Sequence, residues 1–354
     1  MAVVLVYFFS SVAVSLVAVA LVLKLSHKKA WYDRKSTRKI HEGDIPRLGG
    51  LGFGIAFIIT ALAASFITGK NYIDGRFLPA LFALLLILFS GVWDDFRPIS
   101  VRSKLLFQIF AALCVVAAGF VFRRFIYIDI DIPSSLQLLW IPLSIIWLVG
   151  ITNAINFIDG LDGLAGGLSA LIVFFFGLIF FLYSESSLPF LYSVILFGTI
   201  LGFLVFNAPL PKARIFMGDG GSQLLGFSIA LLPLLKNNEE IAALPVLYAA
   251  ALLAIPIFDT IASVWRRIRD GKKIYMPDKS HLHHKLLNLG LSVKSINAVL
   301  CSLQIILGIF TVLAVRKEGF ASLYFLGAAY VIAAAFFAAV HYLNRKLNRK
   351  KHAQ

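Results

Sequence analysis

Eleven long apolar segments constrain the fold of this chain more than any other feature. They cover residues 2–23, 48–68, 77–92, 105–122, 137–152, 164–183, 188–206, 222–235, 241–264, 296–314 and 320–343. A helix needs about 20 apolar residues to cross a bilayer, and most of these segments approach that length. We therefore predict an all-α integral membrane protein with about eleven transmembrane helices, forming a single polytopic domain over residues 1–354.

Composition supports the same fold class. Hydrophobic residues make up 60% of the chain and charged residues only 14%, whereas a soluble domain has about 25% charged residues. The first apolar segment begins at Met1 with no basic residue before it, so we expect a retained span rather than a cleaved signal peptide.

The basic residues predict the orientation. Segments that follow the odd-numbered spans carry 26 of the 33 Lys and Arg residues, and the remaining segments carry 7. Because basic loops stay on the cytoplasmic side, we predict an amino terminus outside and a cytoplasmic carboxyl terminus. The net charge of +15 then reflects loops beside anionic lipid rather than a nucleic-acid partner.

The polar motifs all fall on the predicted cytoplasmic face. Their loops cover residues 24–47, 93–104, 153–163, 207–221 and 265–295. A pore would place ionisable groups at mid-membrane depth, so this one-sided distribution favours a site at the membrane surface. We predict that these five loops form an active site.

Two loops carry acids beside the ends of apolar segments. Asp94 and Asp95 end the third segment, and Asp219 lies in a Gly-rich loop before the eighth. Carboxylate oxygens are the ligands that Mg²⁺ prefers. The alternative for the Asp94-Asp95 pair is a solvated loop start. Phe216, just before the Gly-rich loop, is either a stacking platform for a base or an ordinary interfacial aromatic.

The loop from Asn153 to Gly163 has the highest density of polar groups. Asp159 and Asp162 are three residues apart and would face the same way on a helical turn. Each precedes a glycine, which lets backbone N–H groups approach an oxyanion. The alternative is a helix cap at an ordinary turn, but Asn153 and Asn156 exceed what a cap needs.

The last loop contains three histidines, His281, His283 and His284, near several basic residues. The spacing is not that of a zinc finger, so an anion site is the better interpretation, with a solvated basic loop as the alternative. In the first loop we single out Lys39 and His41 as substrate-binding candidates, because they precede a Pro-Arg-Leu-Gly-Gly run. Acids for Mg²⁺ together with Gly loops and basic groups for phosphates indicate phosphoryl transfer between a diphosphate and a lipid.

These motifs, in this order, resemble those of the polyprenyl-phosphate N-acetylhexosamine-1-phosphate transferases. The matching residues are Asp94-Asp95, Asn153-x-x-Asn156-x-x-Asp159-Gly160-x-Asp162-Gly163, Phe216-Met217-Gly218-Asp219 and His281-x-His283-His284. The His-x-His-His form resembles the WecA/TagO-type branch. The resemblance implies transfer of N-acetylglucosamine 1-phosphate from UDP-N-acetylglucosamine to undecaprenyl phosphate, with release of UMP, to prime a cell-surface polysaccharide or teichoic acid.

The resemblance also implies the cofactor, the setting and the alternatives. It implies Mg²⁺, with Mn²⁺ as a substitute, a bacterial cytoplasmic membrane and a homodimer. Another UDP-hexosamine, or transfer of phospho-N-acetylmuramoyl-pentapeptide, is the alternative within the family. A polytopic transporter is the alternative outside the enzymes, but the chain has no internal repeat, and Asp259 is the one acid well inside a predicted span.

Roles for the site residues follow from the resemblance. Asp219 would be the main Mg²⁺ ligand with Asp95 as a helper, and Asp94 would remove the last proton of the lipid phosphate. The other roles are in nucleotide and sugar binding: Asn153, Asn156, Asp159 and Asp162 would bind the nucleotide or order the site, Phe216 would stack on uracil, and His281, His283 and His284 would hold the sugar-phosphate end. We expect direct attack of the lipid phosphate on the donor, without a covalent aspartyl intermediate.

Overall fold

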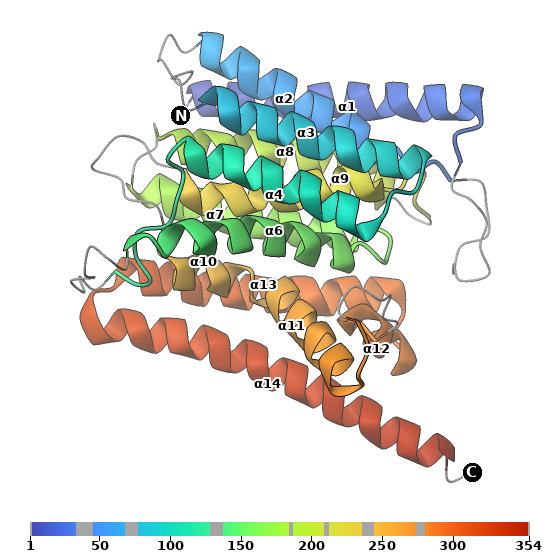
Figure 1. Cartoon of the computed structure of the whole chain (residues 1–354), viewed down its shortest axis with the longest axis vertical. Coiled ribbons are helices and arrows are strands. Elements are labelled where there is room, and N and C mark those ends of the chain that lie inside the picture. Colours follow the sequence, from blue (N-terminus) through green and yellow to red (C-terminus); the bar gives the residue numbers. More distant parts are fainter. Residues whose placement is uncertain are drawn as a thin grey trace.

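The structure is a computed structural model that describes residues 2–32, 45–67, 77–127, 137–183, 187–208, 212–235, 244–273 and 280–352. Its elements in chain order are α1 (Ala2–Lys29), α2 (Gly49–Ile67), α3 (Phe77–Phe96), α4 (Val101–Ala117), α6 (Trp140–Ile158), α7 (Leu164–Tyr183), α8 (Leu188–Asn207), α9 (Gly218–Leu231), η1 (Leu232–Leu234), α10 (Val246–Leu252), α11 (Ala254–Arg269), α12 (Leu282–Asn288), α13 (Val293–Arg316) and α14 (Gly319–His352). Figure 1 shows most of them side by side in one bundle.

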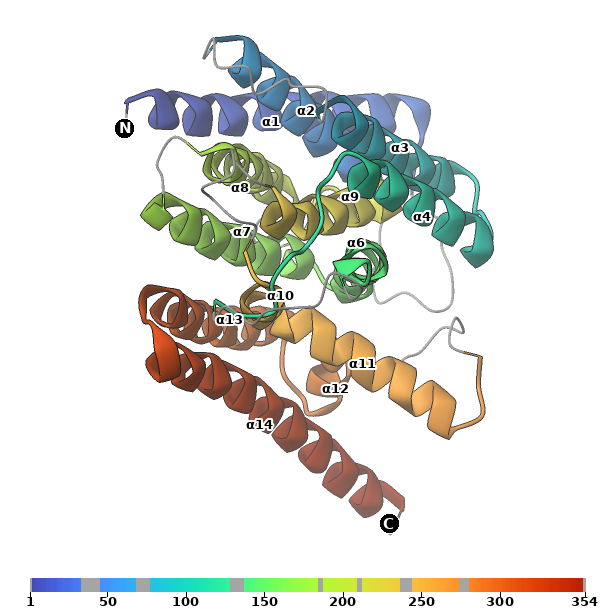
Figure 2. The same ribbon diagram turned by 60° about the vertical axis from the view of Figure 1, so that its left-hand side comes forward.

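Helix α9 is the centre of this bundle. It packs against α3, α6, α2 and α7, and all of its residues except Asp219 are buried. A helix that is apolar on every side is stable only when other helices surround it. Helices α13 and α14 form a separate layer beyond α7 and α10, as Figure 2 shows from the side. The central position of α9 makes its amino-terminal end a fixed point for a site.

The prediction of a helical polytopic protein is confirmed. Among the described residues, seven helices are long and apolar enough to cross a membrane, or eight if the bent pair α10–α11 counts as one span. Each of the eleven predicted segments overlaps a helix. The count of eleven spans stays a prediction, because α2 counts as an apolar helix only over Gly49–Ser65, and α4 and α9 have 17 and 14 residues. The orientation stays a prediction as well.

The ninth predicted segment, residues 241–264, is wrong as a continuous span. Helices α10 and α11 meet at an angle of 89°. Pro256 explains the break, because its ring nitrogen carries no hydrogen for the helical bond to the Leu252 carbonyl. The Gln304 side chain on α13 donates to that carbonyl at 2.9 Å. The bend is therefore stabilised by a neighbouring helix.

Three predicted boundaries near the motifs also need correction. Asn153 and Asn156 lie on the last turns of α6 rather than in a loop. Asp219 lies in the first turn of α9, which starts four residues before the predicted span at 222. Asp159 and Asp162 belong to a turn between α6 and α7, not to a helical turn. The short helix α12 was not predicted.

Candidate active site

Lys104 joins two of the predicted acids. Its ammonium group lies 2.7 Å from Asp94 Oδ2 and also contacts Asp219 Oδ2. The three residues come from the carboxyl end of α3, the amino end of α4 and the amino end of α9. The Lys104 and Asp219 side chains are 25% and 20% exposed, so the cluster is open to a ligand. The structure thus gathers the first and third motifs around one cation.

Asp95 has a different environment from its neighbour. Its side chain is 1% exposed, and its two carboxylate oxygens accept the backbone N–H groups of Asp219 and Gly220, each at 2.9 Å. These are free donors in the first turn of α9, so Asp95 caps that helix from α3. Gly218 has φ +71°, and a Cβ there would collide with the Asp95 carboxylate. Asp95 therefore fixes the position of Asp219.

The electrostatics of the cluster favour a cation. Burial raises the pKa of Asp219, but a hydrogen bond with Asp94 and the charge of Lys104 outweigh it and leave the pKa below its ordinary value. Burial also lowers the pKa of Lys104, and its two acids reverse that shift. Burial raises the pKa of Asp159 to about 7, and the charges of Asp219 and Asp95 add to the shift. The acids are thus only partly neutralised by Lys104 and Arg47.

A second polar layer lies one helical turn deeper. Gln108 follows Lys104 by four residues on α4, and Gln223 follows Asp219 by four on α9. Gln108 donates to Gln223 Oε1 at 3.0 Å, and Asn153 Nδ2 donates to Gln108 Oε1 at 2.7 Å. Asn153 is therefore engaged in a network that ties α6 to α4 and α9. Its substrate-binding role stays a prediction.

Asn156 is engaged in a similar way. Its Nδ2 donates to Ser222 Oγ at 2.7 Å, and that hydroxyl donates to the Gly218 carbonyl at 3.0 Å. The side chain thus fastens α6 to the first turn of α9. Both asparagines of the second motif lie directly beneath the acid cluster and hold it in shape.

The turn between α6 and α7 is held by side chains from other helices. Asn207 Oδ1 accepts the Gly163 N–H at 3.2 Å, and Asn297 Nδ2 donates to the Asp162 carbonyl at 2.9 Å. Asp162 Oδ2 accepts the Ala213 N–H at 3.4 Å. These contacts order the turn, and they place Asp162 toward the 212–217 segment.

The three histidines gather at the other side of this turn. His281 and His283 are 7% and 4% exposed, and their parallel rings are 6.0 Å apart, with His284 4.2 Å from His283. A Cβ at Gly160 would collide with the His283 ring, so only glycine lets the turn approach it. Burial lowers the pKa of His283 to about 4, and His284 adds to this shift. His283 is therefore neutral at physiological pH.

Arg267 extends the histidine cluster along α11. It is 6% exposed, and its guanidinium carbon lies 5.9 Å from the centre of the Phe157 ring, which also contacts His281. Its Nε has no hydrogen-bond partner in the described part of the chain. A buried guanidinium with an unused donor is suited to an anionic ligand.

Other predicted residues are placed less directly. The Phe216 backbone pairs with the segment before α2, through N–H donation to the Pro46 carbonyl at 2.8 Å and acceptance from Gly49 at 3.0 Å; its predicted stacking on uracil is not tested by these contacts. Lys39 and His41 lie outside the described residues. The described residues contain no group of three His, Cys, Asp or Glu side chains that could hold a metal ion.

Three residues of the site were missed from the sequence. Lys104 counted only as a basic loop residue, and Arg267 as one of several loop arginines. Asp259 was noted only as an acid inside an apolar span, yet it accepts a hydrogen bond from His281 Nδ1 at 2.9 Å. A charged residue retained in an apolar helix was the signal that could have identified it.

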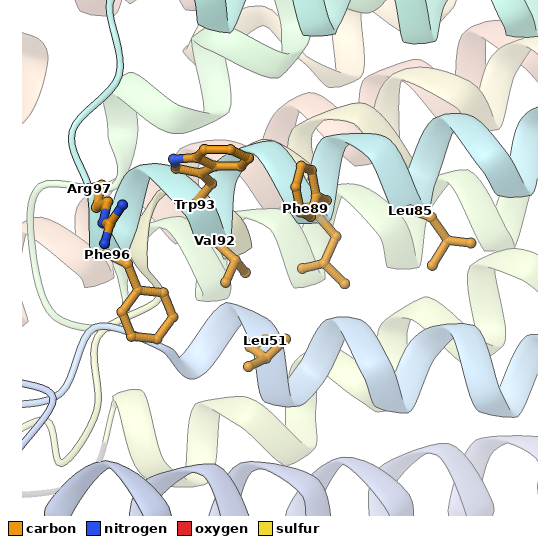
Figure 3. Close-up of a pocket in the computed structure, with 8 residues that line it drawn as sticks. Leu51, Leu85, Phe89, Val92, Trp93, Phe96 and Arg97 are labelled. Carbon is orange, nitrogen blue, oxygen red and sulfur yellow. The ribbon is translucent and has the colours of Figure 1, made fainter. Parts of the chain in front are cut away.

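An apolar groove of about 500 Å³ lies beside the acid cluster, between α2 and α3. Figure 3 shows its lining, with Leu51 on α2 facing a row of α3 side chains that ends at Arg97. The lining residues are Leu51, Leu85, Leu88, Phe89, Val92, Trp93, Phe96 and Arg97. Apart from Arg97 at one end, its lining is apolar and suits a lipid chain.

Comparison with known proteins identifies the family. Residues 77–237 match the sequence model of glycosyl transferase family 4. A probable undecaprenyl-phosphate N-acetylglucosaminyl 1-phosphate transferase of Bacillus subtilis is 35% identical over 80% of this chain and 77% of its own length. The chain belongs to this family. The predicted resemblance to the polyprenyl-phosphate N-acetylhexosamine-1-phosphate transferases is thereby confirmed.

Two further family members cover similar shares of the chain. A decaprenyl-phosphate N-acetylglucosaminephosphotransferase of Mycobacterium leprae is 34% identical over 72% of this chain and 69% of its own length. An undecaprenyl-phosphate alpha-N-acetylglucosaminyl 1-phosphate transferase of Escherichia coli is 27% identical over 75% of this chain and 72% of its own length. The family match spans α3 to α9, which contains Asp94, Lys104 and Asp219.

Proposed function

We propose that this protein transfers N-acetylglucosamine 1-phosphate from UDP-N-acetylglucosamine to undecaprenyl phosphate, giving undecaprenyl-diphosphate-N-acetylglucosamine and UMP. The observation that carries this proposal is the cluster in which Lys104 joins Asp94 and Asp219 at the start of α9. Family relatives named for transfer to undecaprenyl or decaprenyl phosphate support the acceptor. The UDP-sugar donor follows from the family resemblance of the motifs.

Mg²⁺ fits the acid cluster. The fit rests on a partly exposed Asp219 carboxylate and on several acids whose charges are incompletely neutralised. Mg²⁺ binds one or two carboxylates and completes its coordination with water and substrate phosphates, so two available acids suffice. Asp219 is the proposed ligand; Asp95 acts mainly through the α9 cap. The ion would neutralise phosphate charge as the donor reacts.

The chain's own residues perform the remaining steps. A lipid phosphate oxygen forms a bond to the β-phosphorus of the donor, and the bond to the bridging oxygen breaks, so that UMP leaves with both electrons. The second pKa of a phosphomonoester is near 6, so part of the lipid phosphate is a monoanion near neutral pH. Asp94 accepts the remaining proton from that form. Lys104 holds Asp94 and Asp219 in register and offsets the charge of the phosphates.

The histidine cluster binds the donor in this proposal. Arg267 offers an unused guanidinium donor, and His281, His283 and His284 offer imidazole nitrogens beside it. The Asp159 turn lies between this cluster and the acids, through the contact of Gly160 with His283. A diphosphate spanning the turn would reach both. We place the site at the cytoplasmic face of a bacterial inner membrane, with a homodimer as a possible assembly.

The test is UMP release by purified protein with undecaprenyl phosphate, Mg²⁺ and a panel of UDP-sugars. We expect turnover with UDP-N-acetylglucosamine and about a 100- to 1,000-fold loss in Asp219→Asn, the range for removing one electrostatic contact. Asp270→Asn, a surface acid paired with Arg269, is the matched control. An Asp219→Asn variant with full activity would refute the metal assignment. If none of the UDP-sugars is turned over, the transporter alternative is favoured.

A second measurement separates the two mechanisms. Direct attack requires the lipid before the donor diphosphate breaks, whereas a covalent aspartyl intermediate forms without it. We expect no exchange of labelled UMP into UDP-N-acetylglucosamine in the absence of undecaprenyl phosphate. Exchange at a rate similar to turnover would establish the covalent route.

A further inference from the structure

Asp259 is a buried acid in α11 with both carboxylate oxygens engaged. Its side chain is 4% exposed. Oδ2 lies 2.9 Å from His281 Nδ1, and Oδ1 accepts the Leu282 N–H at 2.8 Å. Burying a carboxylate away from water costs free energy unless it is hydrogen-bonded. The partners of Asp259 therefore indicate what the acid does in this apolar helix. The partners of both oxygens, His281 and Leu282, belong to the His281-x-His283-His284 motif.

The contact with His281 determines which ring atom is free. A carboxylate only accepts hydrogen bonds, so Nδ1 of His281 carries a proton and Nε2 remains for a ligand. Ser263 Oγ lies 3.2 Å from the same Nδ1 and accepts from Arg266 Nη2 at 2.8 Å. Two residues of α11 therefore hold one edge of the imidazole.

The contact with Leu282 fixes the backbone as well. Leu282 is the first residue of α12, and its N–H is one of the donors that a helix leaves unpaired at its start. Arg266 reinforces the junction, because its Nη2 donates to the Ser280 carbonyl at 2.8 Å. The ring of His281 and the start of α12 are thus tied to α11 together.

The direction of α11 depends on the break before it. Asp259 follows Pro256 by three residues, so it lies in the second turn of α11, close to the 89° bend. A straight α10–α11 helix would carry Asp259 along the axis of α10 instead. The bend, held by Gln304 from α13, is what brings this acid to the histidine motif.

We propose that Asp259 is a positioning residue for the transfer reaction, which holds His281 so that Nε2 is directed to the phosphates of the donor. The inference rests on the proposed function, because that function supplies the phosphates. A phosphate oxygen only accepts hydrogen bonds, so Nε2 contacts it when Nε2 carries a proton as well as Nδ1. Asp259 then compensates the charge of the ring, as carboxylate partners of functional histidines do. Asp259 itself touches no substrate.

The kinetic test uses three variants in the UMP-release assay. Asp259→Asn keeps the shape and can still accept from Leu282, but it removes the negative charge that stabilises a ring protonated on both nitrogens, the form in which Nδ1 donates to residue 259 and Nε2 donates to a phosphate. We expect a fall in kcat/KM for UDP-N-acetylglucosamine of about 10- to 100-fold, and partial recovery in Asp259→Glu. Thr260→Val is the control, since the Thr260 hydroxyl is buried without a partner in the described residues. Asp259→Asn combined with His281→Gln should lose no more than His281→Gln alone.

A second readout does not depend on activity. Nitrogen NMR of ¹⁵N-histidine-labelled protein reports the ring tautomer, and we expect a protonated Nδ1 on His281 in the wild type and a changed signal in Asp259→Asn. An unchanged His281 signal in both Asp259 variants, or full activity in Asp259→Asn, would overturn the positioning role. Absence of wild-type turnover with every UDP-sugar would instead refute the proposed function, while the NMR comparison would still decide the Asp259 contact.

Discussion

Lys104 illustrates how one residue can serve as an internal counterion. Its contacts to Asp94 and Asp219 join the consecutive helices α3 and α4 to α9, which lies 115 residues further along the chain. In the absence of a metal its ammonium group supplies much of the positive charge that two adjacent carboxylates require.

Replacing Lys104 should therefore make stability depend on Mg²⁺. We expect Lys104→Met to lower the free energy of unfolding by about 3–5 kcal/mol, the cost of leaving buried charges unpaired. Mg²⁺ should restore more of the thermal unfolding midpoint in this variant than in the wild type. Lys272→Met, at an exposed lysine, serves as the control. Equal Mg²⁺ responses in all three proteins would contradict the proposed metal site.

His283 should make stability sensitive to acid. The folded protein holds its pKa at about 4, below the ordinary value of 6.5. Between these values the unfolded chain binds a proton that the folded protein does not, so the free energy of unfolding falls as pH is lowered from 6.5 toward 4. The loss reaches about 3 kcal/mol, and above pH 6.5 this group has no effect.

The measurement compares thermal unfolding of wild type and His283→Gln at pH 5 and pH 7.5. We expect a smaller difference between the two pH values in the variant. Parallel shifts in both proteins would show that His283 is accessible to protons in the folded state. His283→Ala should weaken UDP-sugar turnover far more than it lowers the yield of protein, because the ring lies against the Asp159 turn.

At the scale of elements, the bend between α10 and α11 organises half of the site. The break leaves the Leu252 carbonyl without a helical donor, and Gln304 supplies one. Beyond the bend, α11 carries Asp259, Ser263 and Arg267 on its buried face. One hydrogen bond from α13 thus supports the helix that holds the histidine motif.

Removing that bond should affect both stability and catalysis. We expect Gln304→Leu to lower the free energy of unfolding by about 1–3 kcal/mol, the cost of leaving a buried carbonyl unpaired, and to reduce kcat/KM. Thr311→Val on the same helix is the control, since the Thr311 hydroxyl donates only within α13, to the Leu307 carbonyl. Gln304→Leu with unchanged thermal unfolding would show that the bend needs no support.

Gly160 in the turn between α6 and α7 and Gly150 on α6 form a matched pair of glycines. A Cβ at Gly160 would collide with His283, whereas a Cβ at Gly150 on α6 has open space around it. We expect Gly160→Ala to lower kcat/KM by about 10- to 100-fold by displacing the His283 ring. Gly150→Ala should keep full activity, and alanine favours a helix by about 1 kcal/mol over glycine. Equal activities in the two variants would separate Gly160 from the site.

At the scale of the whole molecule, apolar length predicted the bundle well. Every predicted segment overlaps a helix because burial in lipid imposes helical hydrogen bonding on any long apolar run. The motifs identified Asp94, Asp95 and Asp219, but their contacts depend on pairings across more than a hundred residues. Local spacing contains no information about such pairs, and it therefore could not reveal Lys104 as their bridge. Pro256 was visible, yet a bend also requires a neighbour such as Gln304.

The predicted topology can be tested with single cysteines in a variant lacking Cys114 and Cys301. With eleven spans, Asp74→Cys faces outward and Lys346→Cys faces the cytoplasm. A membrane-impermeant maleimide should label the first in intact cells and the second only after lysis. Labelling of both cysteines in intact cells would place both positions outside. That result would refute the predicted topology, in which the amino terminus is outside and the carboxyl terminus is cytoplasmic.

The capping of α9 by Asp95 has a consequence for biosynthesis. Lys104 is synthesised 115 residues before Asp219, and Asp95 124 residues before the amide that it caps. Synthesis proceeds at about 5–20 residues per second, so these side chains wait roughly 6–25 s for their partners. During that interval Asp94 and Asp95, at the end of α3, can pair only with Lys104 and other nearby basic groups. The acid cluster therefore forms only after α9 has been synthesised, and the histidine cluster on α11 and α12 is added later still.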